Sequence, residues 1–374
     1  MKRFLRNVHA LLEQGEDLVL ATIVASSGST PRSSGAKMAV RRPGLPGERI
    51  VGTVGGGLTE AMAIRDAEAL FDAAPGTALL RELNLNRDLA AGTDMICGGQ
   101  FTLLLEYLAP GCPGALALAR MDTELRKGRA CLLLFRLEEG KPSRATEHAV
   151  LPLWSAETAT TASGLTLSPE ETAQLRLAAQ TRQVSGLFET SLGRVVVEPA
   201  LPPAPVYLYG AGHVSRCTAH IASFAGFRTV VLDDRADFAN TERFPDADRI
   251  VVLDSFENAM PEADAQGPLE VPDQDAFLVI LTRGHLHDKT VLAQALRTSA
   301  RYIGMIGSRK KRDDIYAALR KEGFTDADIA RCHCPIGLSI GAQTPEEIAL
   351  SIVTELVAAR AESAPKPVKE RPAS

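Results

Sequence analysis

The chain has 374 residues, of which 45% are hydrophobic and 23% charged, so composition indicates a soluble globular protein of two or three domains. A formal net charge of −5 argues against a nucleic-acid or anionic-membrane partner, and no run approaches the ~20 apolar residues of a membrane span. Six scattered cysteines show no disulfide framework, which is typical of a reducing compartment, so we expect a cytoplasmic protein.

The first 200 residues mix helix and strand signals. The apolar start over residues 4–12 has helical spacing and charges within it, unlike a signal peptide. A helix is predicted over 60–71, and the cap Ser168 with Pro169 and Glu171 predicts another up to Arg182. Strands are predicted over 18–25, 36–41, 101–108, 130–137 and 194–198. The mixture indicates an α+β domain over 1–200, and the sequence leaves open whether 110–200 is a subdomain.

Three glycine-rich loops lie in this half. Residues 26–38 contain Arg32 and Lys37, residues 52–60 include three consecutive glycines with Gly56 in the middle, and Cys97 precedes two glycines. A triglycine at a helix start exposes several amides to an anion. A cysteine beside glycines is accessible, as a soft-metal ligand or sulfur acceptor must be. A tight turn or a small buried residue explains each loop singly, but three together indicate a binding surface.

The segment 198–205 is rich in proline and predicts an extended linker. Beyond it the rhythm becomes regular, with strands predicted over 206–209, 229–232, 249–253, 276–281 and 301–306. Helical stretches separate most of them, and a capped final helix begins at Thr344. This alternation predicts a Rossmann-like, doubly wound parallel sheet over residues 201–362, so the whole chain is of the α/β class. The proline- and charge-rich tail 363–374 is expected to be disordered.

The first strand of this second half runs into Gly210-Ala211-Gly212, followed by a helical pattern. Glycines in this position let the backbone approach a phosphate, which the helix N-terminus then holds. Asp233 ends the next strand, and its spacing from Gly210 along the chain is close to the ~20 residues expected for an acid that binds ribose. Ser215 stands where a third glycine or alanine belongs. The pattern predicts a nucleotide-type ligand with an incomplete fingerprint.

Polar groups also follow the later strands. His285 and His287 come after the fourth strand, and Ser308, Arg309 and Lys310 come after the fifth. Ligands of open α/β sheets bind beyond the carboxyl ends of strands, so these groups are candidates to contact a phosphate. Ser308 either caps a helix whose basic first turn neutralises phosphate or starts an ordinary solvated basic face. The spacing of Cys332-His333-Cys334 is not that of a zinc knuckle, so metal binding there is disfavoured.

Together these stretches resemble the accessory and maturation factors of xanthine dehydrogenase and related molybdenum hydroxylases, the XdhC/CoxI type. The residues that carry the resemblance are, in chain order, 28–32, 35–38, 55–57 with Glu60, 97–99, 210–214, 284–285 with Asp288, 302–311, 335–342 and 344–349. They span both halves of the chain, whereas 110–195 matches no pattern. Many members have cysteine as the last residue of the glycine triplet, where this chain has Gly57.

The resemblance implies a cofactor chaperone rather than a catalyst. Such proteins bind molybdenum cofactor, protect it while its terminal oxo ligand is replaced by sulfur, and pass it to a molybdenum hydroxylase apoenzyme. The sulfur donor would be a cysteine desulfurase, and a homodimer is expected from base rates. Molybdopterin, or its dinucleotide form, would place phosphate near Gly210. The residues assigned to cofactor binding are Arg32, Gly56, Cys97, Gly210, Gly212, His213, Asp233, His285, Ser308 and Arg309, with Cys97 as the ligand of the metal.

Two other classes of protein compete with this interpretation. An NAD(P)-dependent oxidoreductase would use Asp233 on the ribose and His285 or His287 as proton donor. Ser215 weakens that interpretation, and His213 would crowd a pyrophosphate in the usual pose. An adaptor with a ligand-free Rossmann fold is the third class.

Overall fold

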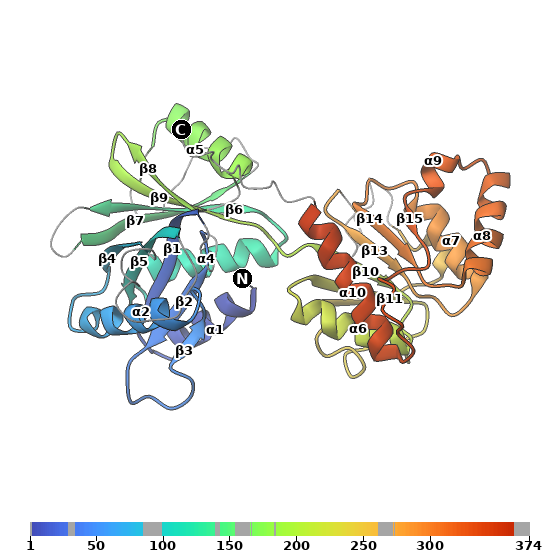
Figure 1. The fold of residues 1–374 in the computed structure, drawn as a ribbon, viewed down its shortest axis with the longest axis horizontal. Helices are drawn as coiled ribbons and strands as arrows, with labels where there is room; N and C mark the ends of the chain where they lie inside the picture. Colours follow the sequence, from blue (N-terminus) through green and yellow to red (C-terminus); the bar gives the residue numbers. More distant parts are fainter. Residues whose placement is uncertain are drawn as a thin grey trace. The chain divides into compact units, whose positions relative to one another are not determined.

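The computed structural model describes residues 2–28, 34–84, 99–138, 143–153, 165, 167–182, 185–260, 272 and 274–362. The chain forms two compact units, which divide between Pro202 and Pro203. Each unit contains its own sheet and its own hydrophobic cores (Figure 1). Within these ranges, no helix combines the length and the apolar character needed to cross a membrane.

The described part of the first unit is built on a nine-stranded antiparallel sheet with the order β3-β2-β1-β5-β4-β7-β6-β9-β8. The strands are β1 Leu18–Gly28, β2 Lys37–Arg41, β3 Ile50–Gly52, β4 Thr77–Asn84, β5 Gly99–Leu108, β6 Cys131–Glu138, β7 Ser143–Pro152, β8 Gly186–Thr190 and β9 Gly193–Ala200. The helices are α1 Lys2–Glu13, α2 Gly57–Leu70, α4 Pro113–Arg126 and α5 Pro169–Arg182.

Side-chain alternation along β1 explains how helices cover both faces of this sheet. Leu18 and Leu20 belong to the core that includes α1 and α4, whereas Val19 and Ala21 belong to the core that includes α2. Successive side chains of a strand point to opposite faces, so each face of β1 receives its own helical layer. The first core also includes residues of β6, β7 and β9, such as Leu133. The predicted α+β class of this part of the chain is confirmed.

The strands of residues 131–200 extend the same sheet. A short pairing of β4 with β7, through Thr77–Arg144 and Ala78–Ser143, joins the two halves of the sheet. Beyond β7, the order continues through β6 and β9 to β8 at the edge. These strands thus lie in the same sheet as β1 to β5 and in the first of the two units.

The predicted linker 198–205 is too long at its start. Strand β9 continues to Ala200, and strand β10 begins at Pro205. Glu198 is buried within β9 at 1% exposure, and Pro199 pairs with Leu132 of β6. Proline is tolerated there because the pairing of β8 with β9 extends only to Val197, so Pro199 faces no strand on that side.

The described part of the second unit is built on a six-stranded parallel sheet with the order β12-β11-β10-β13-β14-β15. The strands are β10 Pro205–Tyr209, β11 Arg228–Asp233, β12 Arg249–Val252, β13 Phe277–Ile280, β14 Tyr302–Met305 and β15 Cys332–His333. The helices are α6 His213–Phe224, α7 His285–Ala295, α8 Arg309–Lys321, α9 Asp326–Ile329 and α10 Pro345–Glu362, with a 3₁₀ turn at Phe256–Asn258.

The strands of the second unit are buried on both faces, which explains their continuous apolar runs. Val206 and Leu208 of β10 lie in the core that α6 and α10 complete, whereas Tyr207 and Tyr209 lie in the core that α7 and α8 complete. In Figure 1, α6 lies next to α10 and α7 lies next to α8. The predicted Rossmann-like, doubly wound sheet is confirmed.

Candidate functional site

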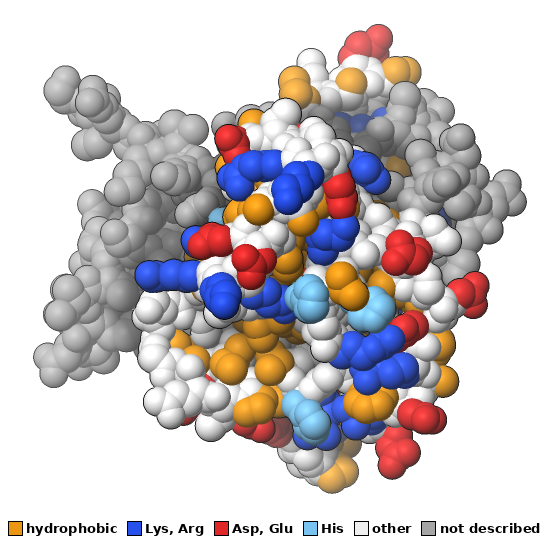
Figure 2. Space-filling model, turned by 90° about the vertical axis from the view of Figure 1, so that its right-hand side faces the viewer, with side chains coloured by type: hydrophobic (Ala, Val, Ile, Leu, Met, Phe, Trp, Pro, Cys, Tyr) orange, Lys and Arg blue, Asp and Glu red, His pale blue; other side chains and the backbone are white. Residues whose placement is uncertain are grey.

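Four of the polar loops that follow the strands lie at one edge of the second sheet. The strand order β11-β10-β13-β14 makes the carboxyl ends of these four parallel strands neighbours. Figure 2 shows Lys, Arg and His side chains on the side of the second unit that faces the viewer, with acidic and hydrophobic side chains among them. An edge of this kind is where open α/β sheets bind ligands.

Gly210 is required by the close approach of two strand ends. Its φ of +109° disfavours any other residue, and a Cβ there would lie 2.3 Å from the carbonyl oxygen of Leu281. Because that contact is with backbone at the end of β13, it cannot give way cheaply. The absence of a side chain at the first glycine of the fingerprint therefore lets the ends of β10 and β13 pack closely together.

Gly212 is different, because it leaves space. It is the N-cap of α6 with an ordinary φ of −74°, which any residue can adopt. Outside its chain neighbours and its own helix, no described atom lies within 4 Å of a Cβ built at this position. His213, the first residue of α6, is exposed beside it. A ligand can thus approach the backbone at Gly212 directly.

Asp233, the predicted ribose acceptor, is bonded within the protein. It is 1% exposed, and its Oδ2 accepts the backbone N–H of Ala211 at 2.8 Å. Arg235 donates its backbone N–H to Oδ1 at 3.0 Å and its guanidinium to both carboxylate oxygens at 2.8 and 2.9 Å. The carboxylate therefore holds the glycine loop in place, and a ribose hydroxyl would compete with Arg235 for it.

The next residue, Asp234, forms an ion pair with Arg283 across the strand ends. Arg283 Nη2 donates to Asp234 Oδ2 at 2.8 Å, and Nη1 donates to Oδ1. This hydrogen bond lowers the pKa of Asp234 to about 2, against the opposing effect of partial burial. Asp234 follows β11 and Arg283 follows β13, so the pair spans the end of β10, which lies between them.

A second, buried carboxylate ties the ends of β13 and β14 together. Asp288 is fully buried in α7, accepts the Thr282 hydroxyl at 2.6 Å, and is paired with Lys311 of α8. Ser308 caps α8 by accepting the N–H of Lys311 at 3.2 Å, a role that the sequence left open beside that of an ordinary solvated basic face. Among the basic residues 309–312, Lys311 is thus paired with Asp288, whereas Arg309 is exposed.

The other predicted contacts at this edge are exposed or packed. His285 is exposed as the first residue of α7, whereas His287 is half-buried with its ring centroid 5.2 Å from that of Phe256. Ser215, in the place of the third glycine of the fingerprint, is fully buried. A small side chain there keeps α6 close to the sheet, as a glycine or alanine would.

In the first unit, only one of the three predicted ligand contacts lies within the described residues. Arg32 and Cys97 fall outside them. Gly56 is the N-cap of α2, and its amide donates to Glu60 Oε1 at 3.0 Å, while the Gly55 amide donates to Thr53 Oγ1 at 3.2 Å. The chain's own carboxylate thus takes the place that the prediction reserved for an anion at the Gly56 amide, and the Thr53 hydroxyl accepts the Gly55 amide.

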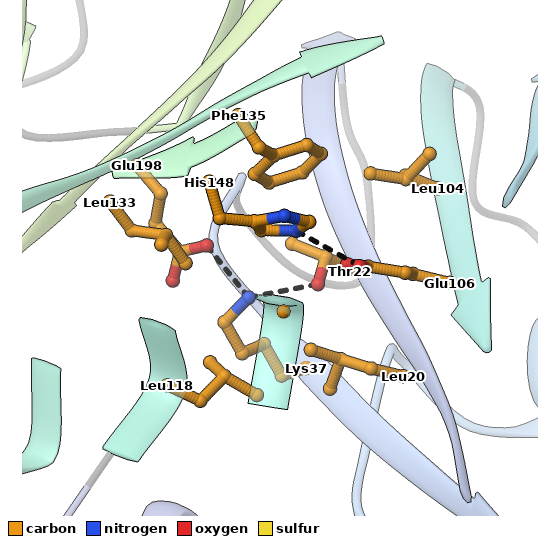
Figure 3. Close-up of a pocket in the computed structure, with 11 residues that line it drawn as sticks. Leu20, Thr22, Lys37, Leu104, Glu106, Leu118, Leu133, Phe135, His148 and Glu198 are labelled. Atoms are coloured by element: carbon orange, nitrogen blue, oxygen red, sulfur yellow. Dashed lines mark hydrogen bonds and ion pairs between the residues drawn. The ribbon is translucent and has the colours of Figure 1, made fainter. Parts of the chain in front are cut away.

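The interior of the first unit holds a cluster of polar side chains that the sequence analysis missed (Figure 3). Lys37 was predicted to lie in a binding loop, but its side chain is only 3% exposed. Its Nζ donates to Glu198 Oε2 at 2.7 Å and to Thr22 Oγ1 at 2.8 Å. This buried ion pair joins β2 to β9, from opposite halves of the sheet.

A second polar pair lies in the same interior. His148 Nε2 is 2.9 Å from Glu106 Oε1, and Phe135 stacks on the imidazole with ring centroids 5.0 Å apart. Figure 3 shows both pairs around a small cavity, which has room for about one water molecule. A lysine starting an apolar strand and a glutamate within another were the signals in the sequence.

The described thiols are of the inert kind. Burial raises the pKa of Cys332 to about 12 and that of Cys334 to about 11, so neither is a thiolate at neutral pH. Across the described ranges, no group of three His, Cys, Asp or Glu side chains is arranged to hold a metal ion.

Fold and site define a protein with an antiparallel α+β unit followed by a Rossmann-like unit with an open glycine loop. Comparison with known families agrees with this class. Residues 206–356 match the XdhC Rossmann domain, and residues 11–81 match the XdhC and CoxI family. Together these matches cover more than half of the chain. The chain belongs to the XdhC and CoxI family, and the resemblance carried by its motifs is confirmed.

Several known proteins are similar to this chain. A probable xanthine dehydrogenase subunit of Bacillus subtilis (strain 168) is 26% identical over 361 residues, which cover 96% of this chain and 98% of that protein. Uncharacterized protein YqeB of Escherichia coli (strain K12) is 33% identical over 150 residues, 40% of this chain and 26% of that protein. The crystal structure of a xanthine dehydrogenase from Bacillus halodurans matches with a TM-score of 0.73, 25% identity and 98% coverage of both chains. Family membership supports an accessory role for xanthine dehydrogenase.

Proposed function

We propose that this chain binds molybdenum cofactor, assists its sulfuration and inserts it into a molybdenum hydroxylase of the xanthine dehydrogenase type. The observation that carries the proposal is the open backbone at Gly212, in a Rossmann-like unit of the XdhC type. A phosphate suits that space because the start of α6 presents backbone N–H groups and a positive helix dipole.

The residues around this space suit an anionic ligand. His213 and His285 are exposed at the starts of α6 and α7, and Arg309 is exposed at the start of α8 behind its Ser308 cap. In the proposal, these groups contact the phosphate of molybdopterin, or the diphosphate of its dinucleotide form. Gly210 and Asp233 do not contact the ligand in this proposal; they hold the glycine loop in place.

The first 200 residues of the sequence offer candidate contacts for the molybdenum end of the cofactor. We assign the metal contact to Cys97, because a thiolate is a soft ligand, and Arg32 and Gly56 to nearby contacts of the cofactor. Glu60 would have to release the Gly56 amide for that contact to form. A cysteine desulfurase as sulfur donor, a homodimer and a cytoplasmic location stay predictions.

Reconstitution tests the proposed function. Xanthine dehydrogenase apoenzyme is mixed with cofactor released from a donor enzyme, in the presence or absence of this chain and a sulfide source. We expect this chain to raise both the rate and the final extent of activation. Equal activation without it would contradict a role in insertion or sulfuration.

Replacing Cys97 by alanine should impair client maturation while leaving the protein folded. A strain that carries Cys97→Ala in place of the wild type should show reduced hydroxylase activity, because the proposed metal contact is gone. Cys112→Ala is the matched control, since burial raises the pKa of the half-buried Cys112 thiol, and it should leave client activity unchanged. Wild-type client activity with Cys97→Ala would remove Cys97 from the site.

The alternative function is an NAD(P)-dependent oxidoreductase, which the Rossmann-like unit allows. The acid of the nicotinamide fingerprint, Asp233, is held by Arg235, so a nicotinamide dinucleotide would lack its usual ribose acceptor at that position. NADH and NADPH binding, measured beside that of the molybdenum cofactor, distinguishes the two functions.

A further inference from the structure

The Asp234–Arg283 ion pair lies on the expected path of a ligand but has no part in the sequence motifs. The two side chains come from strands on either side of β10, and both lie at the end where Gly210 begins the glycine loop. Arg283 Nη1 is also 3.9 Å from Asp233 Oδ1, the carboxylate that holds Ala211. The guanidinium therefore lies near the carboxylate that holds the glycine loop at Ala211.

We propose that this ion pair is the resting form of a binding site for a ribonucleoside diphosphate group. Arg283 exchanges the Asp234 carboxylate for the diphosphate, and the released carboxylate accepts a hydroxyl group of the ribose. The inference rests on the proposed function and specifies it, because it assigns the dinucleotide form of the cofactor as the ligand.

The exchange is chemically reasonable because phosphate and carboxylate offer the same acceptor geometry. A guanidinium binds either anion with two parallel N–H donors. The Arg283 side chain is 38% exposed, and that of Asp234 is 16% exposed. Because the arginine side of this pair is open to water and solvent weakens the attraction, a more highly charged diphosphate can replace the carboxylate.

The neighbouring Arg235 cannot exchange its carboxylate partner for a diphosphate in the same way. Arg235 is bonded to both oxygens of Asp233, a fully buried carboxylate that also fixes Ala211. Removing a partner from a buried charge costs several kcal/mol, so that pair is structural. Two adjacent Asp–Arg pairs thus differ in burial, and only the exposed one is suited to exchange.

The position of Asp234 suits this carboxylate to accept a ribose hydroxyl. In Rossmann units, the acid that accepts ribose hydroxyls ends the strand after the glycine loop, which here is β11. Asp233 at that position is committed to Ala211 and Arg235. Asp234 is the next carboxylate, and it becomes available once Arg283 moves to the diphosphate.

Calorimetric titration of the full chain tests the exchange. The probes are inorganic pyrophosphate, the nucleoside diphosphates ADP, CDP and GDP, and NADH, which share a diphosphate from different sources. We expect Asp234→Asn to bind pyrophosphate about threefold to tenfold more tightly than the wild type, because Arg283 is released from its partner. The preference for nucleoside diphosphate over pyrophosphate should fall in this variant, because the ribose acceptor has lost its charge. Arg283→Gln should weaken both classes about tenfold or more.

The chain offers a matched control at the opposite edge of the same sheet. Arg301 and Asp275 form an Arg–Asp pair at 2.5 Å before β14 and β13, at the amino ends of the strands. Asp275→Asn removes the same charge from the same unit and should change no affinity. An Asp234→Asn variant that behaves like Asp275→Asn would overturn the exchange, and so would a wild type that binds neither pyrophosphate nor any nucleoside diphosphate.

The outcomes separate this inference from the proposed function. Retention of molybdenum cofactor without diphosphate binding would overturn the exchange and leave the chaperone function standing. Diphosphate binding with the expected variant pattern, but no cofactor retention, would support the exchange site and contradict the chaperone function. Tight binding of NADH alone among the nucleotides would contradict both.

Discussion

The Gly212→Asp variant should fold normally and retain molybdenum cofactor roughly 100-fold less well than the wild type, or worse. Aspartate is a preferred N-cap residue, and Gly212 caps α6 with extended backbone that aspartate adopts without strain. Apart from its chain neighbours and its own helix, no described residue has an atom within 4 Å of a Cβ at this position. The carboxylate would enter the space proposed for phosphate, and like charges in contact cost several kcal/mol. Fluorescence of the oxidised pterin in the retained fraction measures the loss.

Two variants show whether charge at this position is the cause. Gly212→Asn has the same size and also caps helices, but it is neutral, so it should retain more cofactor than Gly212→Asp. Gly210→Ala should instead destabilise the whole unit, because its Cβ would collide with the backbone at Leu281. Equal retention by Gly212→Asp and the wild type would move the phosphate away from this loop.

Replacing Lys37 by methionine should lower the free energy of unfolding of the first unit by about 3–5 kcal/mol. The substitution keeps the volume but leaves Glu198 as an unpaired charge, and the Glu198 side chain is only 2% exposed. The loss should occur even though Lys37 is outside the proposed ligand contacts. Urea denaturation followed by circular dichroism gives the size of the change, and hydrogen exchange of β2 and β9 assigns it to the first unit.

The double variant Lys37→Met with Glu198→Leu distinguishes an unpaired charge from lost packing. Because neither partner remains, most of the lost stability should return. Arg320→Met is the exposed counterpart, since it breaks an Arg320–Asp326 pair that is open to solvent, and it should cost less than about 1 kcal/mol. A double variant as unstable as Lys37→Met would contradict the role assigned to the ion pair.

The strands of the second unit could be predicted because they are buried on both faces. Residues 206–209 and 229–232 are continuous apolar runs, and turns separate them from helical patterns. The strands β4 and β7 of the first unit were missed for the opposite reason. Residues 77–84 interrupt their apolar residues with Arg81 and Glu82, which are exposed on an antiparallel sheet.

The candidate site was only partly readable, because pairing between distant residues leaves no local pattern. The fingerprint correctly marks Gly210 and Gly212 as a loop at the carboxyl edge of the sheet. It gives no sign that Arg235 occupies the carboxylate of Asp233. Nor does the sequence show that Lys37 meets Glu198, 161 residues away, inside the first unit.

Cofactor retention tests the central claim most directly. The purified chain is mixed with molybdenum cofactor released from a donor enzyme and passed through a desalting column, with NADH and NADPH as parallel ligands. The retained fraction is then assayed for the fluorescence of the oxidised pterin. We predict one pterin per chain and its loss in Gly212→Asp. A retained fraction without pterin, together with tight nicotinamide binding, would contradict the chaperone function and point to an oxidoreductase.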